Sequence, residues 1–308
     1  MATATMGAPG RTRWTRRWPS DVEAYLYCAP AITLIVVVML VPLAVGISYA
    51  FRDLELLNPF SGGYVGLENF RELWGDADFF RAMRNTVWWT FGSVALQFFL
   101  GLGLALLLRQ AFPGRRLVQA LVFLPWAVPT FLSGLNWAWL FNPVVGPLPH
   151  WMATLGMLDE PRNILADPDL AMWGPITANV WYGVPFFAIT LLAALQSIPD
   201  EIYEAAAIDG AGAWRAFRDI TLPFLAPTIA ITVMLRTIWI ANFADLIVVM
   251  TNGGPADRTQ IMASYIFTQA YRRLDFGYAS AISLVLLVLL MLYALAIVSL
   301  RRVMLRAS

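Results

Sequence analysis

Long stretches without a charged residue alternate with short polar segments along this chain. The charge-free runs are 24–51, 85–108, 117–158, 170–199 and 276–300, and a sixth apolar stretch, 226–250, contains only two charges. About 20 helical residues cross a hydrocarbon layer of roughly 30 Å, and these runs lack the alternation of a strand. We therefore predict an all-α polytopic membrane protein with six transmembrane helices, at about 28–51, 86–108, 118–141, 171–194, 226–250 and 278–300.

Composition strengthens this prediction and excludes some partners. Hydrophobic residues make up 59% of the 308 positions and charged residues 13%, against about 25% charged residues in a soluble domain. The formal net charge of +1 gives no reason to expect a nucleic-acid partner. We expect a disordered cytoplasmic tail over 1–24, a transmembrane domain over 25–302 in contact with lipid, and a cytoplasmic tail over 303–308.

The arginines predict the orientation. They are more frequent in the two tails and in the loops after the second and fourth spans than in the other loops, and basic residues favour the cytoplasmic side. Both termini should therefore be cytoplasmic. Arg16 and Arg17 could also belong to a twin-arginine export signal, but the following charge-free run of about 28 residues is too long for a signal-peptide core. An uncleaved first span is the better interpretation.

Candidate catalytic and metal-binding residues are scarce. Cys28 and His150 are the one cysteine and the one histidine of the sequence, so an internal disulfide, a zinc site or a Ser-His-Asp site is not expected. The sequence contains no lysine, and a phosphate-binding loop that holds ATP requires one. We predict that the chain is not an enzyme, has no catalytic residue or metal ligand, and binds no cofactor of its own.

The polar segment between the fourth and fifth spans, 197–223, reads as two short cytoplasmic helices. Ser197 with Asp200 resembles a capping box, and the first helix should cover about 198–209. Gly210 can adopt the left-handed conformation that ends a helix. The second helix should cover about 213–220 and end at Pro223.

The first of these helices has a surface suited to docking. Its alanines, Ala205–Ala207, would let another backbone approach closely. The alternative is an amphipathic helix that lies on the lipid surface. Because the helix carries acids rather than a basic face, anionic lipid would repel it, and a protein partner is the better interpretation.

The same segment resembles the cytoplasmic signature loop of permease subunits of ATP-binding-cassette (ABC) importers. The family pattern is E-A-A, three residues, Gly, nine residues and I-x-L-P, and "EAAAIDGAGAWRAFRDITLP" fills every fixed position. The resemblance implies that this loop docks into a groove of a separate ATPase subunit. The residues implied in coupling are Glu204, Ala205, Ala206, Asp209, Gly210, Leu222 and Pro223.

Further segments resemble the carbohydrate branch of this family, the group of maltose, trehalose and glycerol-phosphate permeases. They are "YVGLENF" (64–70), "NTVWWT" (85–90), "FLPWAVPTFLSGLNWAWLFNP" (123–143), "LIVVMTNGGPADRTQIMASYIFTQAY" (246–271) and "FGYASAIS" (276–283). The resemblance covers about residues 25–302. It implies a bacterial or archaeal cytoplasmic membrane, a second homologous permease, an ATPase dimer that holds ATP and Mg²⁺, and an extracytoplasmic solute-binding protein.

Polar and aromatic residues within the spans are candidates for a substrate pathway. Arg236 and Asp245 lie in the fifth span and are expensive to place there. They are about 180° apart around a helix, so they should contact different neighbours. An arginine paired with a carboxylate or carbonyls is the structural alternative. Aromatic rings near amides suit a sugar, and the full set is Asn136, Trp137, Asn179, Tyr182, Arg236, Trp239, Asn242, Phe243 and Asp245.

The sequence therefore predicts one half of the transmembrane pathway of an ATP-driven importer for a di- or oligosaccharide. A glycerol-phosphate or polyol importer of the same family is the nearest alternative, and Arg236 favours it. An ion-coupled secondary transporter and a membrane enzyme are the alternatives outside the family. The sequence shows no convincing inverted repeat of the kind found in many secondary transporters.

Overall fold

The computed structural model describes residues 20–307, and all the secondary structure in that range is helical apart from two isolated bridges. The disorder predicted for 1–24 lies outside this range for 1–19, and residues 20–24 are helical as the start of α1. The elements are α1 Ser20–Ile35, η1 Val36–Leu40, α2 Val41–Tyr49, α3 Glu68–Gly75, α4 Ala77–Arg109, α5 Arg115–Ala127, α6 Thr130–Leu140, α7 Pro147–Thr154, η2 Ile164–Ala166, α8 Trp173–Gln196, α9 Asp200–Ile208, α10 Ala213–Ala216, η3 Phe217–Thr221, α11 Leu222–Ala241, α12 Asp245–Met250, α13 Met262–Tyr271 and α14 Phe276–Ala307.

The chain divides into two units, 1–48 and 49–308. In the first unit, α1, η1 and α2 follow one another without a break. The stretch Tyr25–Tyr49 is long and apolar enough to cross a membrane, as predicted for 28–51. The helix begins earlier than the prediction because its first turns contain polar residues that a search for apolar runs leaves out.

In the second unit, four unbroken helices meet the length and hydropathy needed for a span: Ala77–Arg109, Trp173–Gln196, Ala213–Ala241 and Phe276–Ser299. With the first unit this makes five in residues 20–307, or six if a bent helix pair, α5 with α6, is one span. The all-helical membrane fold is therefore confirmed. The second helix starts at Ala77 rather than near 86, because Asp76 accepts a hydrogen bond from the Asp78 N–H and caps it.

The third span is not the continuous helix predicted for 118–141. α5 ends at Ala127, α6 begins at Thr130, and the two helices are bent by 99°. Val128 is extended and Pro129 follows it. A residue before proline is pushed out of the helical region, and proline lacks the N–H that would continue the ladder. The pair Val128-Pro129 is a helix-breaking pattern that the sequence already contained. The prediction did not use it, because the prediction considered only the length of the charge-free run.

The fifth span is also interrupted, although the sequence predicted one helix over 226–250. α11 ends at Ala241 and α12 begins at Asp245. The buried carbonyl of Ile240, next to this break, accepts a hydrogen bond from the Trp89 indole at 2.9 Å. Backbone groups within a membrane need protein partners, so a side chain from α4 stabilises this break.

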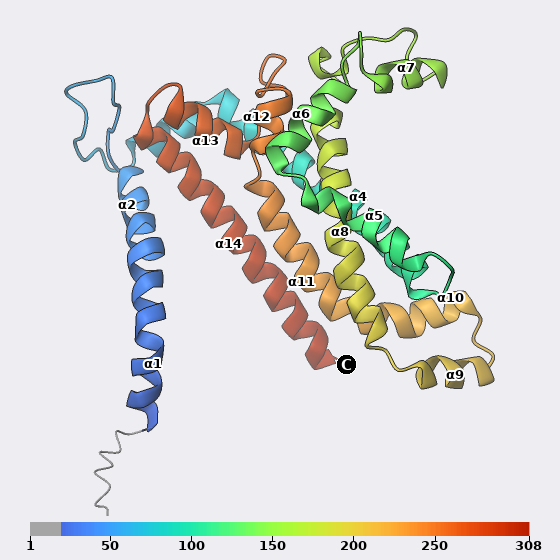
Figure 1. Ribbon diagram of the computed structural model, residues 1–308. Helices are drawn as coiled ribbons and strands as arrows, with labels where there is room; N and C mark the ends of the chain where they lie inside the picture. Colours follow the sequence, from blue (N-terminus) through green and yellow to red (C-terminus); the bar gives the residue numbers. More distant parts are fainter. Residues whose placement is uncertain (1–19, 308) are drawn as a thin grey trace, which may run out of the picture. The chain divides into compact units, whose positions relative to one another are not determined.

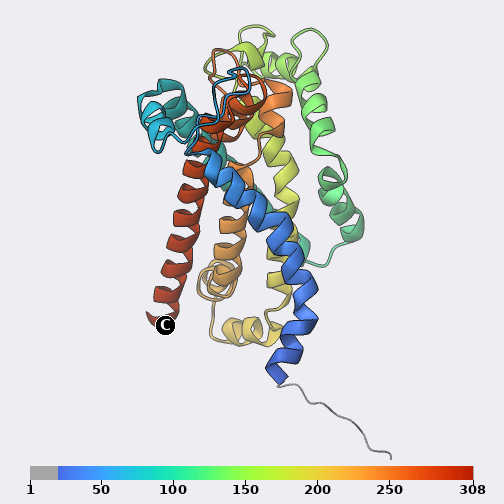
Figure 2. The ribbon, with the colours of Figure 1, turned by 90° about the vertical axis from the view of Figure 1, so that its left-hand side faces the viewer.

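α4 and α8 pack closely along their lengths in the second unit (Figure 1). Gly101 permits the contact, because a Cβ there would lie 3.1 Å from the Ala188 nitrogen and 3.2 Å from the Val184 carbonyl oxygen. Buried apolar side chains from α8, such as Phe187 and Leu191, form the centre of the main hydrophobic cluster. Figure 2 shows α5 and α6 as two differently inclined green helices beside this bundle.

The polar segment differs from its prediction in two respects. Ser197 does not cap α9: its hydroxyl donates to the Ala194 carbonyl, and Pro199 is the N-cap residue. Pro223 does not end the second helix, because α10, η3 and α11 form one continuous helix and Pro223 lies in the first turn of α11, where proline is tolerated. Gly210 does end α9, with a left-handed φ of +77°.

Candidate functional site

A cavity of about 360 Å³ opens where α8 faces the end of α11. It lies in the part of the second unit that includes the broken third and fifth spans, drawn in green and orange in Figure 1. Four aromatic side chains supply most of its wall, together with one amide and one guanidinium. Its lining residues are Trp126, Tyr182, Arg236, Ile238, Trp239, Ile240, Asn242 and Phe243.

Arg236 is the charged residue of this cavity, and it is only 5% exposed. Its Nε donates a hydrogen bond to the Gln97 side-chain oxygen of α4 at 2.7 Å. The Gln97 amide nitrogen in turn donates to the backbone carbonyl of Asn179 in α8 at 2.9 Å. Three helices therefore fix the orientation of one guanidinium group.

Gly183 makes room for this arrangement. A Cβ at Gly183 would overlap the Gln97 side-chain amide and the Nη2 atom of Arg236. α8 thus presents bare backbone where the two long polar side chains meet. Sequence reasoning gave Gly183 no role, because a glycine in an apolar helix has no distinctive pattern.

One aromatic ring contacts the guanidinium, and others line the cavity. Tyr182 and Phe243 are stacked with their ring centroids 6.3 Å apart. The ring centroids of Phe186 and Trp239 are 5.5 Å apart. The guanidinium carbon of Arg236 is 5.9 Å from the centroid of the Phe186 ring, within the range of a cation–π contact. Trp239 is 51% exposed, so it offers a broad apolar face at the mouth of the cavity.

The cavity brings together five of the nine residues predicted for a substrate pathway: Tyr182, Arg236, Trp239, Asn242 and Phe243. The other four lie elsewhere. Asn136 is exposed on α6, Trp137 packs against Phe141 and Trp181, and Asn179 is fully buried beside Gln97. Asp245 accepts a hydrogen bond from Thr130 at 3.0 Å.

The Thr130–Asp245 hydrogen bond joins the starts of α6 and α12, directly after the two helix breaks. A Cβ at Gly134 would approach Val249 to 2.9 Å, so α6 and α12 are also closely packed. Arg236 and Asp245 contact different neighbours, as their spacing predicted. Of the structural partners expected for Arg236, the described residues supply no carboxylate, but the amide carbonyl oxygen of Gln97 on α4 accepts a hydrogen bond from its Nε.

Sequence reasoning missed Gln97 and Trp126. Gln97 lies at the middle of the charge-free run 85–108. A search of the spans for uncharged polar residues as well as ionised ones would have found it. Trp126 precedes the break at Pro129, and nothing in its spacing indicates that the bend turns it toward α11.

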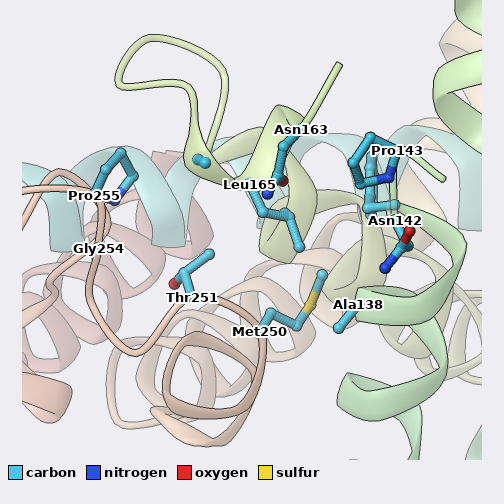
Figure 3. Close-up of a pocket in the computed structure, with 11 residues that line it drawn as sticks. Ala138, Asn142, Pro143, Asn163, Leu165, Met250, Thr251, Gly254 and Pro255 are labelled. Atoms are coloured by element: carbon cyan, nitrogen blue, oxygen red, sulfur yellow. The ribbon is translucent and has the colours of Figure 1, made fainter. Parts of the chain in front are cut away.

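A second cavity, of about 410 Å³, lies near the α7 end of the second unit. Its wall comes from the end of α6, the segment around η2 and the loop after α12. Figure 3 shows Asn142 and Asn163 on one side of the cavity and Thr251 on the other. The loop after α12 is held in place by Asn85 of α4. The Asn85 amide nitrogen donates to the Arg258 carbonyl at 3.0 Å and to the Gln260 carbonyl at 2.9 Å.

Asp76 forms a separate charged cluster at the start of α4. Its carboxylate accepts hydrogen bonds from the hydroxyls of Tyr265 and Tyr278, both at 2.6 Å, and from the Asp78 N–H at 2.8 Å. Burial alone would raise the pKa of Asp76, but these donors outweigh it and hold the pKa below the usual 3.8. Burial and the neighbouring carboxylate raise the pKa of Tyr265.

The inner side of α9 is fixed to the rest of the unit. The guanidinium carbon of Arg109, at the end of α4, lies 4.2 Å from the centroid of the Tyr203 ring. The same arginine pairs with Asp200 at 3.4 Å. The Tyr203 hydroxyl is also 2.9 Å from the Thr221 hydroxyl. These contacts tie α9 to the end of α4 and to the part of the continuous helix directly before α11.

The outer side of the same segment is open. Glu204 is exposed and makes no ion pair with any residue in the described part of the chain. Ile208 is 88% exposed and Trp214 is 73% exposed. Six of the seven residues predicted to couple to an ATPase are exposed, and Ala206 is half-buried. The exposed ones are Glu204, Ala205, Asp209, Gly210, Leu222 and Pro223.

Comparison with known proteins gives consistent matches. Residues 97–306 match the family described as "Binding-protein-dependent transport system inner membrane component". The chain is 35% identical to the trehalose/maltose transport system permease protein MalF of Thermococcus litoralis, over 88% of this chain and 90% of that protein. It is also 35% identical to the sulfoquinovosyl glycerol transport system permease protein SmoG of Agrobacterium fabrum, over 91% of each.

Solved structures agree in fold. A chain of a bacterial ABC transporter involved in the import of the acidic polysaccharide alginate superposes with a TM-score of 0.79 at 24% identity, covering 92% of this chain and 96% of that chain. A second structure, the alginate transporter in complex with an alginate pentasaccharide-bound periplasmic protein, gives a TM-score of 0.77 at 24% identity and covers 90% and 93%.

Proposed function

The chain belongs to the family of binding-protein-dependent transport system inner membrane components, and from that premise we propose that it forms half of the pathway for a di- or oligosaccharide. It is the permease subunit of a sugar ABC importer, and it is not an enzyme, since the ATPase of such an importer is a separate subunit. The family therefore supports neither an ion-coupled transporter nor a membrane enzyme.

The observation that carries the substrate proposal is the aromatic cavity at the end of α11. Apolar ring faces suit the C–H faces of a sugar, and a few fixed polar groups suit its hydroxyls. Trp239 provides such a face, with Asn242 and Arg236 beside it. The names of the two relatives, one for trehalose and maltose and one for sulfoquinovosyl glycerol, are consistent with a glycoside. A glycerol-phosphate or polyol substrate is the second candidate, and Arg236 is the observation that favours it.

We propose that the cavity is completed by a second, homologous permease. Trp126 and Trp239 are both more than 40% exposed in the single chain, so the wall on this side is open. A partner permease would close the wall around a sugar. A solute-binding protein would deliver the sugar at the α7 end, and both termini and α9 would lie in the cytoplasm, as the arginine distribution predicts.

We also propose that the open side of α9 is the coupling surface for the ATPase dimer, which would bind ATP and Mg²⁺. The exposed Glu204 would pair with a basic group of the ATPase, and Ile208 would enter an apolar groove. Movement of α9 would reach the spans through Arg109 and Thr221, since both are joined to Tyr203. The cavity would then alternate between inward-facing and outward-facing states.

The test of the transport proposal is uptake by the complete importer in vesicles. We expect uptake of a radiolabelled sugar to depend on ATP and to survive a protonophore. The sugar itself would be identified by mass spectrometry of ligand that copurifies with the complex. Trp239→Ala should lower uptake about 10-fold or more, since burial of one aromatic face contributes on the order of 1.5–3 kcal/mol. Uptake that is abolished by the protonophore but indifferent to ATP would refute the proposal.

A pair of glycines tests the coupling surface. Gly210 has a φ of +77°, whereas Gly212 has a φ of −71° and an extended ψ, and neither has a neighbour within 4 Å of an added Cβ. Valine at Gly210 is strained, and the same change at Gly212 is not. We expect Gly210→Val to reduce ATP-dependent uptake strongly and Gly212→Val to reduce it little. Equal uptake by the two variants would remove Gly210 from the coupling role.

A further inference from the structure

We propose that the sugar carried by this permease bears an anionic group, and that Arg236 binds this anion in the cavity at the end of α11. The inference rests on the proposed function, because it names the substrate class of the same cavity. The anion could be a carboxylate, a sulfonate or a phosphate ester. These groups share the planar or tripodal oxygen arrangement that a guanidinium recognises.

The first argument is the missing counter-charge. Arg236 is 5% exposed and lies within a span. None of the ion pairs among the described residues includes it. No aspartate or glutamate in the described part of the chain lines the cavity, and the nearby Asp245 is hydrogen-bonded to Thr130. A buried charge without a partner is unfavourable, so an anion in the cavity would supply the missing interaction.

The second argument is the way the guanidinium is held. Gln97 occupies Nε and accepts through a neutral amide oxygen, so it orients the charge without neutralising it. Among the described residues, this is the one hydrogen bond that the guanidinium makes. The Nη nitrogens are thus left with donors for a ligand. Gly183 lets the guanidinium lie directly against the backbone of α8, because a Cβ there would overlap Nη2.

The third argument is the low polarity of the surroundings. Tyr182, Trp239 and Phe243 surround the same space, and hydrogen bonds to a charge are stronger in a medium of low dielectric constant. A neutral hydroxyl would receive the donors but leave the positive charge uncompensated. An anion receives two donors and cancels the charge, which makes it the better complement to this cavity.

The experiment uses the complete importer, with both permeases and the ATPase, in lipid nanodiscs and without the binding protein. Three probes share one skeleton: a glucosyl-glucose disaccharide, the same disaccharide with a carboxylate at C6 of the terminal ring, and the same disaccharide with a phosphate ester at that position. Equilibrium dialysis measures each dissociation constant. We expect the better anionic probe to bind the wild-type complex about 10- to 100-fold more tightly than the neutral one, as charge-assisted hydrogen bonds allow.

Variants assign the preference to Arg236. Arg236→Gln should bind all probes with similar affinity, and Arg236→Lys should keep part of the preference because it keeps the charge. Gln97→Leu should weaken binding of the anionic probes more than of the neutral one, because Nε loses its orienting partner. Size-exclusion profiles identify any variant that does not assemble. Arg236→Lys keeps the test valid if Arg236→Gln is such a variant.

The outcomes separate the two proposals. Equal affinity for neutral and anionic probes in the wild type, or a preference that survives Arg236→Gln, would overturn the anion inference while ATP-dependent sugar uptake still supports the transport proposal. If Trp239→Ala weakens all three probes equally and Arg236→Gln removes only the charge preference, both proposals are supported. Absence of sugar uptake by the complete importer would overturn both.

Discussion

Two charged groups in this protein are held in opposite ways. Asp76, at the start of α4, accepts hydrogen bonds from two tyrosine hydroxyls and one backbone N–H of its own chain. Arg236, in α11, makes one hydrogen bond, to Gln97, within the described residues, and it lines a cavity. The described residues thus give the Asp76 carboxylate three hydrogen-bond donors, but they give the Arg236 guanidinium only one acceptor.

This difference separates a structural charge from one available to a ligand. Tyr265 and Tyr278 come from α13 and α14, so the Asp76 cluster ties three helices together and leaves few acceptor positions unused. Around Arg236, in contrast, one partner fixes the direction of the side chain and the remaining donors are free for a ligand. The predictions below test each half of this comparison.

The largest effect is expected for Asp76→Ala. Removal of the carboxylate takes away two hydrogen bonds to a charged group and leaves two tyrosine hydroxyls without their acceptor, which costs about 3 kcal/mol of unfolding free energy. Chemical unfolding of the complex in detergent measures the loss. The control is Asp78→Ala, which removes a half-exposed pair with Arg81, worth less than about 1 kcal/mol. Equal losses would show that the Asp76 cluster is not special.

An intermediate effect is expected for Gly183→Ala. Its Cβ would overlap the side chains of Gln97 and Arg236, and overpacking of this kind costs about 2 kcal/mol. Affinity for the anionic probe should fall as well, because the guanidinium must move. Gly103→Ala is the matched control, since no atom lies within 4 Å of a Cβ there. An unchanged probe affinity in Gly183→Ala would mean that the position of Arg236 does not depend on this glycine.

The smallest effect is expected from acid. The pKa of Asp76 in the folded protein lies below its usual 3.8, so the ionised carboxylate contributes stability above about pH 4. That contribution is lost as the pH falls through the lower, folded pKa. Thermal unfolding in detergent between pH 7 and pH 3 should show a steeper decline for the wild type than for Asp76→Asn. The decline is smaller than the effect of Asp76→Ala, because a protonated carboxyl still contacts the two tyrosines. Parallel declines in both proteins would contradict the assigned cause.

The spans show which parts of the fold were predictable. Runs such as 170–199 identified helices correctly, because lipid requires both a long apolar segment and backbone hydrogen bonds within it. The breaks in the third and fifth spans were not predicted. The first followed from Val128 and Pro129, and local conformational rules could have found it. The second depends on Trp89 of α4, which is far away in the sequence and supplies a donor to the Ile240 carbonyl.

The candidate site, like the spans, could be predicted from the sequence only in part. Arg236 and Trp239 were found because charges and aromatic clusters stand out in an apolar helix. Asn136 and Asn179 were assigned to the same site because each lies beside aromatic residues within a span, and the structure places neither on the wall of the cavity. Gln97 was missed because its role comes from its position opposite Arg236 and Gly183, on a different helix.

The sequence by itself determined the membrane character of the chain, four of its six expected spans as unbroken helices, and the end of α9 at Gly210. These properties depend on local chemistry: hydrophobicity and the φ angle that one glycine allows. Only the tertiary structure decided that Arg236 receives an amide instead of a carboxylate, and that four aromatic residues line the same cavity. The Arg236–Gln97 hydrogen bond joins residues 139 positions apart, and the aromatic contacts join α8 to α11 and the segment after it. The physical reason for these contacts is the packing of α4, α8 and α11, which no single stretch of sequence specifies.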